Sequence, residues 1–207
     1  MKKIMITLFV LAFVLESYAQ TKIAIKAGYN YSFARVYFND IKQPSDSKNG
    51  YGIGILFKAP IEGVVHFSPY IAFNSRGFVI RPLADTFKKA EFSIQYIDFV
   101  PALSFDLPTG GNSFDISVGP VFGFTSFGHQ KVTNNNDVTT SKKLTFGYGS
   151  YGWIDIGLSG SLGYHMKKVF FEAGYFLGLA NINNDESNIP QNIRNRMVSL
   201  NIGYYIK

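Results

Sequence analysis

The stretch KIAIKAGYNYSF, residues 22–33, decides the fold of this chain. Its odd-numbered positions carry Ile, Ile, Ala, Tyr, Tyr and Phe, whereas its even-numbered positions carry Lys, Ala, Lys, Gly, Asn and Ser. Successive side chains of a β-strand point to opposite faces, so a period of two gives the strand one apolar face and one small or polar face. Residues 22–33 therefore predict a two-faced β-strand.

The same alternation returns along the rest of the chain. Four further clear segments begin at Phe114, Ile154, Val169 and Val198. Three less regular segments span Gly50–Lys58, Val64–Phe78 and Glu91–Asp106. Together with residues 22–33, the pattern predicts eight strands.

One of the less regular segments changes the phase of its alternation. Phe92 and Ile94 are apolar at even positions, but Ile97 and Phe99 are apolar at odd positions. One extra residue in a strand reverses which positions face which way. We therefore expect a β-bulge near Gln95–Tyr96.

The connections between these segments alternate in length. The short ones are Ala59–Gly63, Leu107–Asn112 and Met166–Lys168. The long, polar ones are Arg35–Asn49, Ile80–Ala90, Gly128–Gly149 and Asn181–Asn195. An even number of strands with short turns at one end and long loops at the other is typical of outer-membrane β-barrels. In such a barrel both termini lie on the periplasmic side.

The N-terminus has the features of a secretory signal peptide. Lys2 and Lys3 form a basic start, Ile4–Leu15 is apolar, and Ser17–Ala19 is a small-residue cleavage site. The apolar run is too short to cross a bilayer as a helix, which takes about 20 residues. We expect residues 1–19 to be the signal peptide and residues 20–207 to form one outer-membrane β-barrel domain. The chain has no cysteine, which excludes disulfides and a lipid-modified cysteine.

Alternation alone fits two kinds of barrel, because a soluble lipocalin-like barrel also alternates but turns its apolar face inward. Charged residues make up only 16% of this chain, and aromatic residues also make up 16%. The polar faces carry mainly Gly, Ser, Ala and Asn, which suit a narrow interior better than a soluble exterior. We therefore expect the apolar face to meet lipid.

The apolar faces are aromatic near both strand ends, as in the two interfacial girdles of membrane barrels. The predicted periplasmic girdle consists of Phe57, Phe67, Phe105, Phe114, Tyr164, Phe171 and Tyr204. The predicted outer girdle consists of Tyr29, Tyr31, Tyr51, Phe73, Phe122 and Phe124.

The chain also resembles the outer-membrane β-barrel family described as porin-family or PorT-like. The resemblance covers the mature chain and rests on the order of Ile25–Ser32, Tyr96–Leu103, Val118–Pro120, Tyr175–Ile182 and Leu200–Tyr205. It implies an eight-stranded barrel in the outer membrane of a Gram-negative bacterium, inserted by the barrel-assembly machinery. It implies no catalytic site, since the family shares none.

The polar faces bring charged residues of both signs into the predicted interior. Lys26, Arg76, Asp98, Asp155 and Glu172 lie at middle heights of their strands. Because an unpaired buried charge is costly, we expect them to form an ion-pair network that fills the lumen. A path for protons or small ions is the alternative interpretation.

Signals for chemistry are weak. Asp155 and Glu172 lie on neighbouring predicted strands and in principle share acid and base roles, which would suit a lipid-modifying membrane enzyme. The three histidines, His66, His129 and His165, are scattered, so no metal site is predicted, and no motif indicates a cofactor. We do not expect an enzyme.

The sequence thus predicts an outer-membrane β-barrel with a plugged polar interior and a structural or surface-binding role. The open alternatives are a component of a protein-secretion apparatus, a lipid-modifying enzyme and a soluble ligand-binding barrel. Expected partners are outer-membrane lipid, lipopolysaccharide near the basic loops, the barrel-assembly machinery and an envelope protein. Nucleic acid is not expected, because the loops lack interleaved aromatic residues.

Overall fold

The computed structural model describes residues 21–38, 40–81, 87–184 and 192–206. The predicted signal peptide, residues 1–19, lies outside the described residues. No helix in the described part of the chain is long and apolar enough to cross a membrane. The strands are β1 (Lys22–Phe38), β2 (Ile41–Gln43), β3 (Ser45–Glu62), β4 (Val65–Phe67), β5 (Tyr70–Ile80), β6 (Lys89–Val100), β7 (Leu103–Thr109), β8 (Asn112–Thr133), β9 (Thr139–Lys143), β10 (Ile154–Met166), β11 (Val169–Gly178) and β12 (Asn192–Tyr205).

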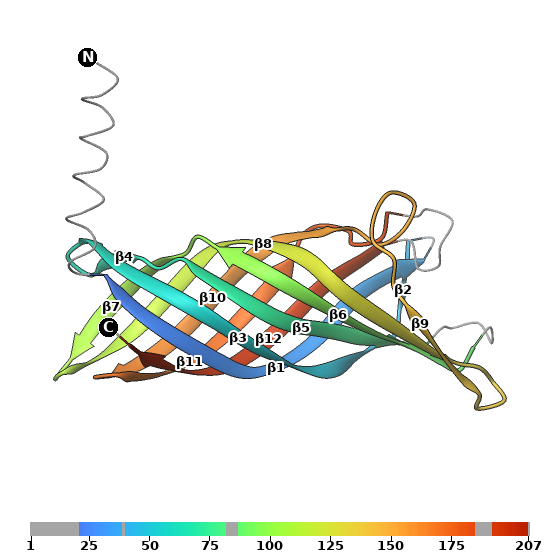
Figure 1. The fold of residues 1–207 in the computed structure, drawn as a ribbon, viewed down its shortest axis with the longest axis horizontal. Helices are drawn as coiled ribbons and strands as arrows, with labels where there is room; N and C mark the ends of the chain where they lie inside the picture. The colour runs from blue at the N-terminus through green and yellow to red at the C-terminus, as the bar shows by residue number, and fades with distance from the viewer. Residues whose placement is uncertain (1–20, 39, 82–86, 185–191, 207) are drawn as a thin grey trace, which may run out of the picture.

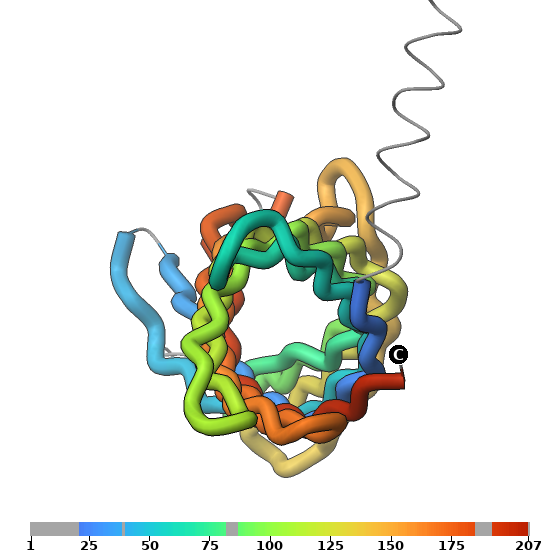
Figure 2. The backbone as a smooth tube through the Cα atoms, turned by 90° about the vertical axis from the view of Figure 1, so that its left-hand side faces the viewer, coloured from blue at the N-terminus to red at the C-terminus, as the bar shows by residue number. Residues whose placement is uncertain are grey.

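The strands form one antiparallel sheet that closes on itself, because β1 pairs with β3 on one side and with β12 on the other (Figures 1 and 2). β4 and β5 form one barrel strand interrupted before Tyr70, and β6 and β7 form another interrupted before Leu103. Pro69 and Pro101 stand at these interruptions, and proline lacks the N–H that a sheet ladder needs. β2 and β9 are short additions at one end. The eight-stranded antiparallel barrel predicted from the sequence is therefore confirmed.

The two faces of the barrel differ as the alternation predicts. On the outside, Ile25 is 44% exposed and Leu200 is 60% exposed. On the inside, Lys26 is 6% exposed and Arg76 is 2% exposed. Apolar side chains thus point outward and charged side chains point inward. The soluble lipocalin-like alternative, which needs the opposite orientation, is wrong.

The two ends of the barrel differ in their connections, and we call them the turn end and the loop end. At the turn end, β3–β4, β7–β8 and β10–β11 are joined by tight turns. Each turn contains a residue with a positive φ angle. These angles are 54° at Gly63, 56° at Gly110, 96° at Gly111 and 46° at Lys167. Glycine suits such turns because it has no Cβ. The first and last described strands also begin and end at this end (Figure 1).

The strands extend further toward the loop end than the sequence predicts. β1 continues to Phe38, β3 starts at Ser45 and β8 continues to Thr133, so much of the predicted long loops is strand. Beyond the apolar band neither strand face needs to be apolar, and the alternation fades. Backbone hydrogen bonds continue the hairpins there.

The predicted bulge exists, but it lies on the facing strand. Gln95 pairs with Phe127 and Tyr96 pairs with Thr125, so the extra residue is Ser126 of β8. Along β6 the even positions stay inward, and Phe92 and Tyr96 are both fully buried. The interpretation of a phase change within β6 is therefore wrong.

The even positions at the start of β6 are apolar because the interior itself becomes apolar at the loop end. The cluster there, which we call the loop-end cluster, consists of Ala34, Val36, Phe78, Ile80, Ala90, Phe92, Ile94, Tyr96, Leu144, Ile182 and Ile193. Phe78 and Phe92 stack with their ring centroids 4.7 Å apart. The expectation of a polar interior along the whole barrel is wrong at this end.

Two members of the loop-end cluster come from connecting segments rather than from barrel strands. Leu144 follows β9, and Ile182 follows β11. The Gly152 N–H donates to the Ile182 carbonyl at 2.7 Å, and the Ile182 N–H donates to the Ile193 carbonyl at 2.9 Å. The two segments are thus bonded to each other and to β12 while they place apolar side chains in the mouth of the barrel.

Candidate functional site in the barrel interior

The charged interior residues come from seven of the eight barrel strands and are stacked in layers below the loop-end cluster. Along β1, the inward positions pass from Val36 in that cluster to Asn30 and then to Lys26. Because only every second residue of a strand faces inward, each strand contributes one side chain to a layer.

Arg76 forms the layer nearest the loop-end cluster. Its Nη2 donates to Asp98 Oδ2 at 2.6 Å, and its Nη1 donates to Asp155 Oδ2 at 3.2 Å. The guanidinium lies against the rings of Tyr96 and Phe176, at 4.5 and 4.1 Å from the ring centroids. A buried charge is tolerated only with partners of this kind.

Amide side chains complete the Arg76 layer. Asn74 Nδ2 donates to Asp98 Oδ2 at 2.6 Å, and Asn195 Nδ2 donates to Asp155 Oδ2 at 2.8 Å. The second oxygen of each carboxylate, Oδ1, is buried without a hydrogen-bond partner. The layer therefore holds one cation and two carboxylates, and Arg76 is the ion-pair partner of both carboxylates.

Gly123 makes room for this layer. It lies on β8 directly between its cross-strand partners Asp98 of β6 and Asp155 of β10. A Cβ at this position would lie 2.7 Å from Asp98 Oδ1 and 3.1 Å from Arg76 Nη1. The lack of a side chain at Gly123 therefore lets the guanidinium fit between the two carboxylates.

Lys26 and Glu172 form the next layer toward the turn end. Lys26 Nζ donates to Glu172 Oε1 at 2.9 Å and lies 3.8 Å from the centroid of the Tyr70 ring. Asn201 Nδ2 donates to the same Glu172 oxygen at 2.9 Å. A cavity of about 40 Å³ adjoins these side chains. That volume suits a few ordered water molecules, not a solute.

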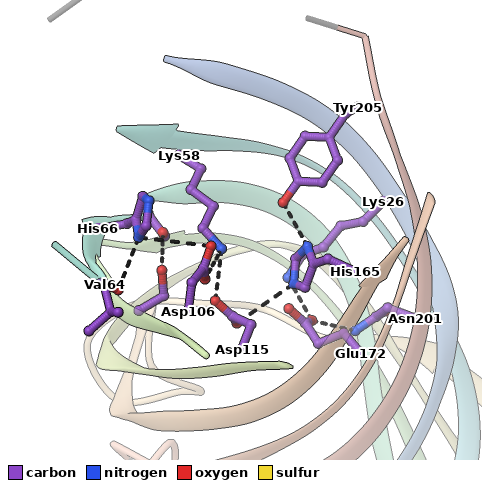
Figure 3. Close-up of polar contacts among 12 residues, drawn as sticks. Lys26, Lys58, Val64, His66, Asp106, Asp115, His165, Glu172, Asn201 and Tyr205 are labelled. Carbon is purple, nitrogen blue, oxygen red and sulfur yellow. Dashed lines mark hydrogen bonds and ion pairs between the residues drawn. The ribbon is translucent and has the colours of Figure 1, made fainter. Parts of the chain in front are cut away.

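A third group of charges surrounds Lys58 at the turn end (Figure 3). Lys58 Nζ donates to Asp115 Oδ2 at 2.9 Å and also to Asp106. His66 Nδ1 lies 3.9 Å from Asp106, and His165 Nε2 lies 4.0 Å from Asp115. Both carboxylates are thus paired with the same ammonium group.

His165 is held by further contacts with Tyr205 and Phe170. Its Nδ1 is 2.9 Å from the Tyr205 hydroxyl, and its ring stacks on Phe170 at 4.9 Å. Glu172 lies beside it in Figure 3 and links this group to the Lys26 layer. The ion pairs of the interior therefore join three cations to five carboxylates across the three layers.

Sequence reasoning placed Lys26, Arg76, Asp98, Asp155 and Glu172 together in the interior, and these residues do face inward. It missed Lys58, which is buried and bonds two carboxylates. The alternation of the sequence could have identified Lys58 as inward-facing, because it continues the even-numbered inward series of β3 after Leu56. It also missed Asn74 and Asn195, whose amides have no charge to mark them.

The structure separates the two carboxylates that could have shared acid and base roles. Glu172 pairs with Gly163 across the β10–β11 ladder, eight positions along β10 from Asp155. That spacing corresponds to about 26 Å along the strand. Each carboxylate bonds a different cation, so they do not form an acid–base pair. In the described residues, no group of three or more His, Asp or Glu side chains could hold a metal ion.

The residues of the two predicted aromatic girdles lie on the outward face. Most are exposed, while Tyr164 and Phe73 are half-buried against neighbouring rings. Phe114 and Tyr164 have ring centroids 4.9 Å apart, and Phe73 lies 6.3 Å from Phe127. Their contact with the two membrane interfaces stays a prediction.

An antiparallel barrel of eight strands with an apolar exterior and a charged interior belongs to the class of transmembrane β-barrels. Residues 18–184 match the family described as outer membrane protein beta-barrel domain, so the chain belongs to this family and its location is the outer membrane. The narrower porin-family or PorT-like assignment stays a prediction. No curated protein sequence matches the chain.

Solved structures with a similar arrangement include three bacterial proteins, each 13% identical to this chain. Neisserial surface protein A matches 88% of this chain and 96% of its own, with a TM-score of 0.49. OprG from Pseudomonas aeruginosa matches 89% and 95%, with a TM-score of 0.48. Ail of Yersinia pestis, in complex with the heparin analogue sucrose octasulfate, matches 90% and 99%, with a TM-score of 0.46.

Proposed function

We propose that this protein is a closed, non-conducting barrel that anchors four connecting segments at the cell surface and has a structural or surface-binding role. The observation that carries the proposal is the filling of the interior over its length. Three charged layers occupy the middle and the turn end, and an apolar cluster occupies the loop end. An aqueous channel needs a continuous polar path, which the loop-end cluster interrupts.

The orientation of the barrel follows from its two kinds of ends. In outer-membrane barrels the short turns are periplasmic and the long connections are extracellular. The loop end is then the surface-exposed end, and Leu144 and Ile182 close it from the outside. A barrel of eight strands has an interior just wide enough to be filled by side chains, which agrees with this role.

We propose further that the barrel contacts lipopolysaccharide, which carries anionic groups in the outer leaflet. The basic residues of the loop end that form no ion pair with a carboxylate among the described residues support this contact; Arg35, Lys42, Arg194 and Arg196 are among them. Cations held at the height of anionic head groups gain electrostatic attraction to them.

Conductance in planar bilayers tests the closed barrel. The refolded wild-type protein should give no steady conductance, because no continuous water path crosses the loop-end cluster. Folding is checked independently by heat-modifiable migration on a gel. A steady open channel from folded wild-type protein would refute the proposal.

The Phe92→Ala, Ile94→Ala variant sharpens the conductance test, because it removes volume from the loop-end cluster and leaves the outward face unchanged. We expect brief openings in this variant and none in Ile97→Ala, Phe99→Ala, which alters the outward face of the same strand. Equal behaviour of the two variants would mean that the loop-end cluster does not close the barrel.

A further inference from the structure

Two arginines face each other on the outside of the barrel near the loop end. Arg35 of β1 and Arg194 of β12 are direct cross-strand partners. Arg196 lies two positions further along β12 and therefore points to the same face. Like charges directly opposite each other across an antiparallel pair destabilise it.

The burial pattern fixes the direction of these side chains. Ala34 and Val36 flank Arg35 and are buried in the interior, and Ile193 and Asn195 flank Arg194 in the same way. The arginines must therefore point outward. We call Arg35, Arg194 and Arg196 the arginine patch.

The patch stands just beyond aromatic residues of the outward face. Along β1, Tyr29, Tyr31 and Phe33 precede Arg35 at every second position. Arg35 is four residues beyond Tyr31, which is about 13 Å along the strand and roughly 10 Å along the axis of a barrel with tilted strands. If Tyr31 lies at the membrane interface, the patch lies at the height of the lipid head groups.

No carboxylate neutralises the patch in the part of the chain that the structure describes, since none forms an ion pair with any of its three arginines. The Nε of Arg196 is also buried without a hydrogen-bond partner. Lys42 of β2 adds a further cation beside the patch, opposite Tyr37.

A second basic group on the barrel exterior has a carboxylate partner. Lys48 and Lys89 both bond Glu91, at 3.3 and 2.8 Å, and Lys131 is the cross-strand partner of Glu91. This group, which we call the lysine group, carries its own counter-ion. Among the described residues the arginine patch has no such counter-ion, and guanidinium groups bind phosphate through two parallel hydrogen bonds more readily than ammonium groups do.

We propose that the arginine patch binds a phosphate group of lipopolysaccharide in the outer leaflet. The proposal deepens the lipopolysaccharide contact suggested above and rests on it. A bound phosphate would relieve the repulsion between Arg35 and Arg194 and accept hydrogen bonds from their exposed guanidinium groups. The apolar chains of the same lipid would lie along Tyr31 and Val198, which face outward just below the patch.

Lipid binding by matched variants tests the patch. The mature protein is refolded in lipopolysaccharide-free detergent and titrated with diphosphorylated lipid A, followed by native mass spectrometry. Arg35→Gln, Arg194→Gln should weaken binding about tenfold or more, because charge-assisted hydrogen bonds are lost. Lys48→Gln, Lys131→Gln makes the same change in net charge at the lysine group and should leave the affinity within about twofold of wild type.

Two other ligands identify what the patch recognises. Lipid A without phosphate should bind the wild type as weakly as the arginine variant binds the intact lipid. Equal losses in the two double variants, or undiminished binding of phosphate-free lipid, would overturn the proposal. Binding of inorganic phosphate as tight as that of the lipid would also overturn it, because the site would then serve a free anion.

Stability without the lipid gives a second readout. Arg194→Gln should raise the unfolding temperature in lipopolysaccharide-free detergent, because it removes the repulsion, and should gain less from added lipid A than the wild type. A lower unfolding temperature in lipid-free detergent would show that the patch is stabilised internally and needs no ligand. Conductance of the same variant should stay at zero, so failure of the lipid site can be told apart from failure of the closed barrel.

Discussion

The middle of the barrel interior and its loop end are built on the same strands but are filled in opposite ways. In the middle, Arg76 and Lys26 hold buried carboxylates by ion pairs and amide hydrogen bonds. At the loop end, Phe78, Phe92 and their neighbours exclude charge altogether. The difference teaches that inward-facing and polar are separate properties. A narrow barrel can close its interior with either chemistry, provided that every charge has a partner.

Arg76→Ala should have the largest effect on stability. It leaves Asp98 and Asp155 buried without their cation, which typically costs about 3–5 kcal/mol. Urea unfolding in lipid vesicles measures the loss. The triple variant Arg76→Met, Asp98→Asn, Asp155→Asn removes the charges together and should recover most of the stability. A single variant as stable as wild type would mean that the layer is not held by charge.

Phe92→Ala probes the apolar loop-end cluster. It should lower the free energy of unfolding by about 3 kcal/mol, because it opens a cavity among packed rings. The loss should fall at the lower end of the usual range, since the segments carrying Leu144 and Ile182 can settle into the space. Phe99→Ala, on the outward face of the same strand, is the control and should cost clearly less. Equal costs in the same unfolding assay would contradict the inward packing of Phe92.

Gly123→Ala tests how tightly the Arg76 layer is fitted. The added methyl group would contact Asp98 and the guanidinium, and overpacking of this kind typically costs about 1–3 kcal/mol. Gly160→Ala is the matched control, because a Cβ there meets only the Ser117 carbonyl at 3.9 Å. If both variants unfold at the same urea concentration, space at Gly123 is not what admits Arg76.

Lys48→Gln should have the smallest effect of the series. The Lys48–Glu91 pair is partly exposed on the barrel exterior, where such a pair contributes about 0.2–1 kcal/mol. The loss should shrink further at high salt, because salt screens exposed charges. A loss as large as that of Arg76→Ala would remove the distinction between interior and exterior ion pairs.

The sequence predicts the barrel well because the lipid-facing set alternates strictly. Ile25 and Leu200 reveal their direction through period and hydropathy alone, and so does Lys26 on the opposite face. The tight turns are also predictable, since Gly63 and Gly110 mark them. Strand ends at the loop end are not, because residues such as Ser45 and Thr133 pair through their backbones with no pattern in their side chains.

The interior is only partly predictable from the sequence. Charges such as Arg76 and Glu172 are conspicuous on a small-residue face, but their partners depend on strand register, which period two does not fix across the barrel. Phe92 and Ile94 are apolar although they face inward, so hydropathy alone wrongly assigns them to the outside. Only the register of β6 against β5 and β8 shows that they fill the mouth of the barrel.

The central claim is that the interior is closed and that the even-numbered residues of β6 face it along the whole strand. Cysteine accessibility can test this claim. The chain has no cysteine, so single substitutions at Phe92, Ile94, Ile97, Asp98 and Phe99 report without background. In vesicles, a water-soluble thiol reagent should fail to label positions 92, 94 and 98, while a lipid-soluble reagent should label 97 and 99. Rapid labelling of the even positions by the water-soluble reagent, in variants that still migrate as folded protein, would contradict the account.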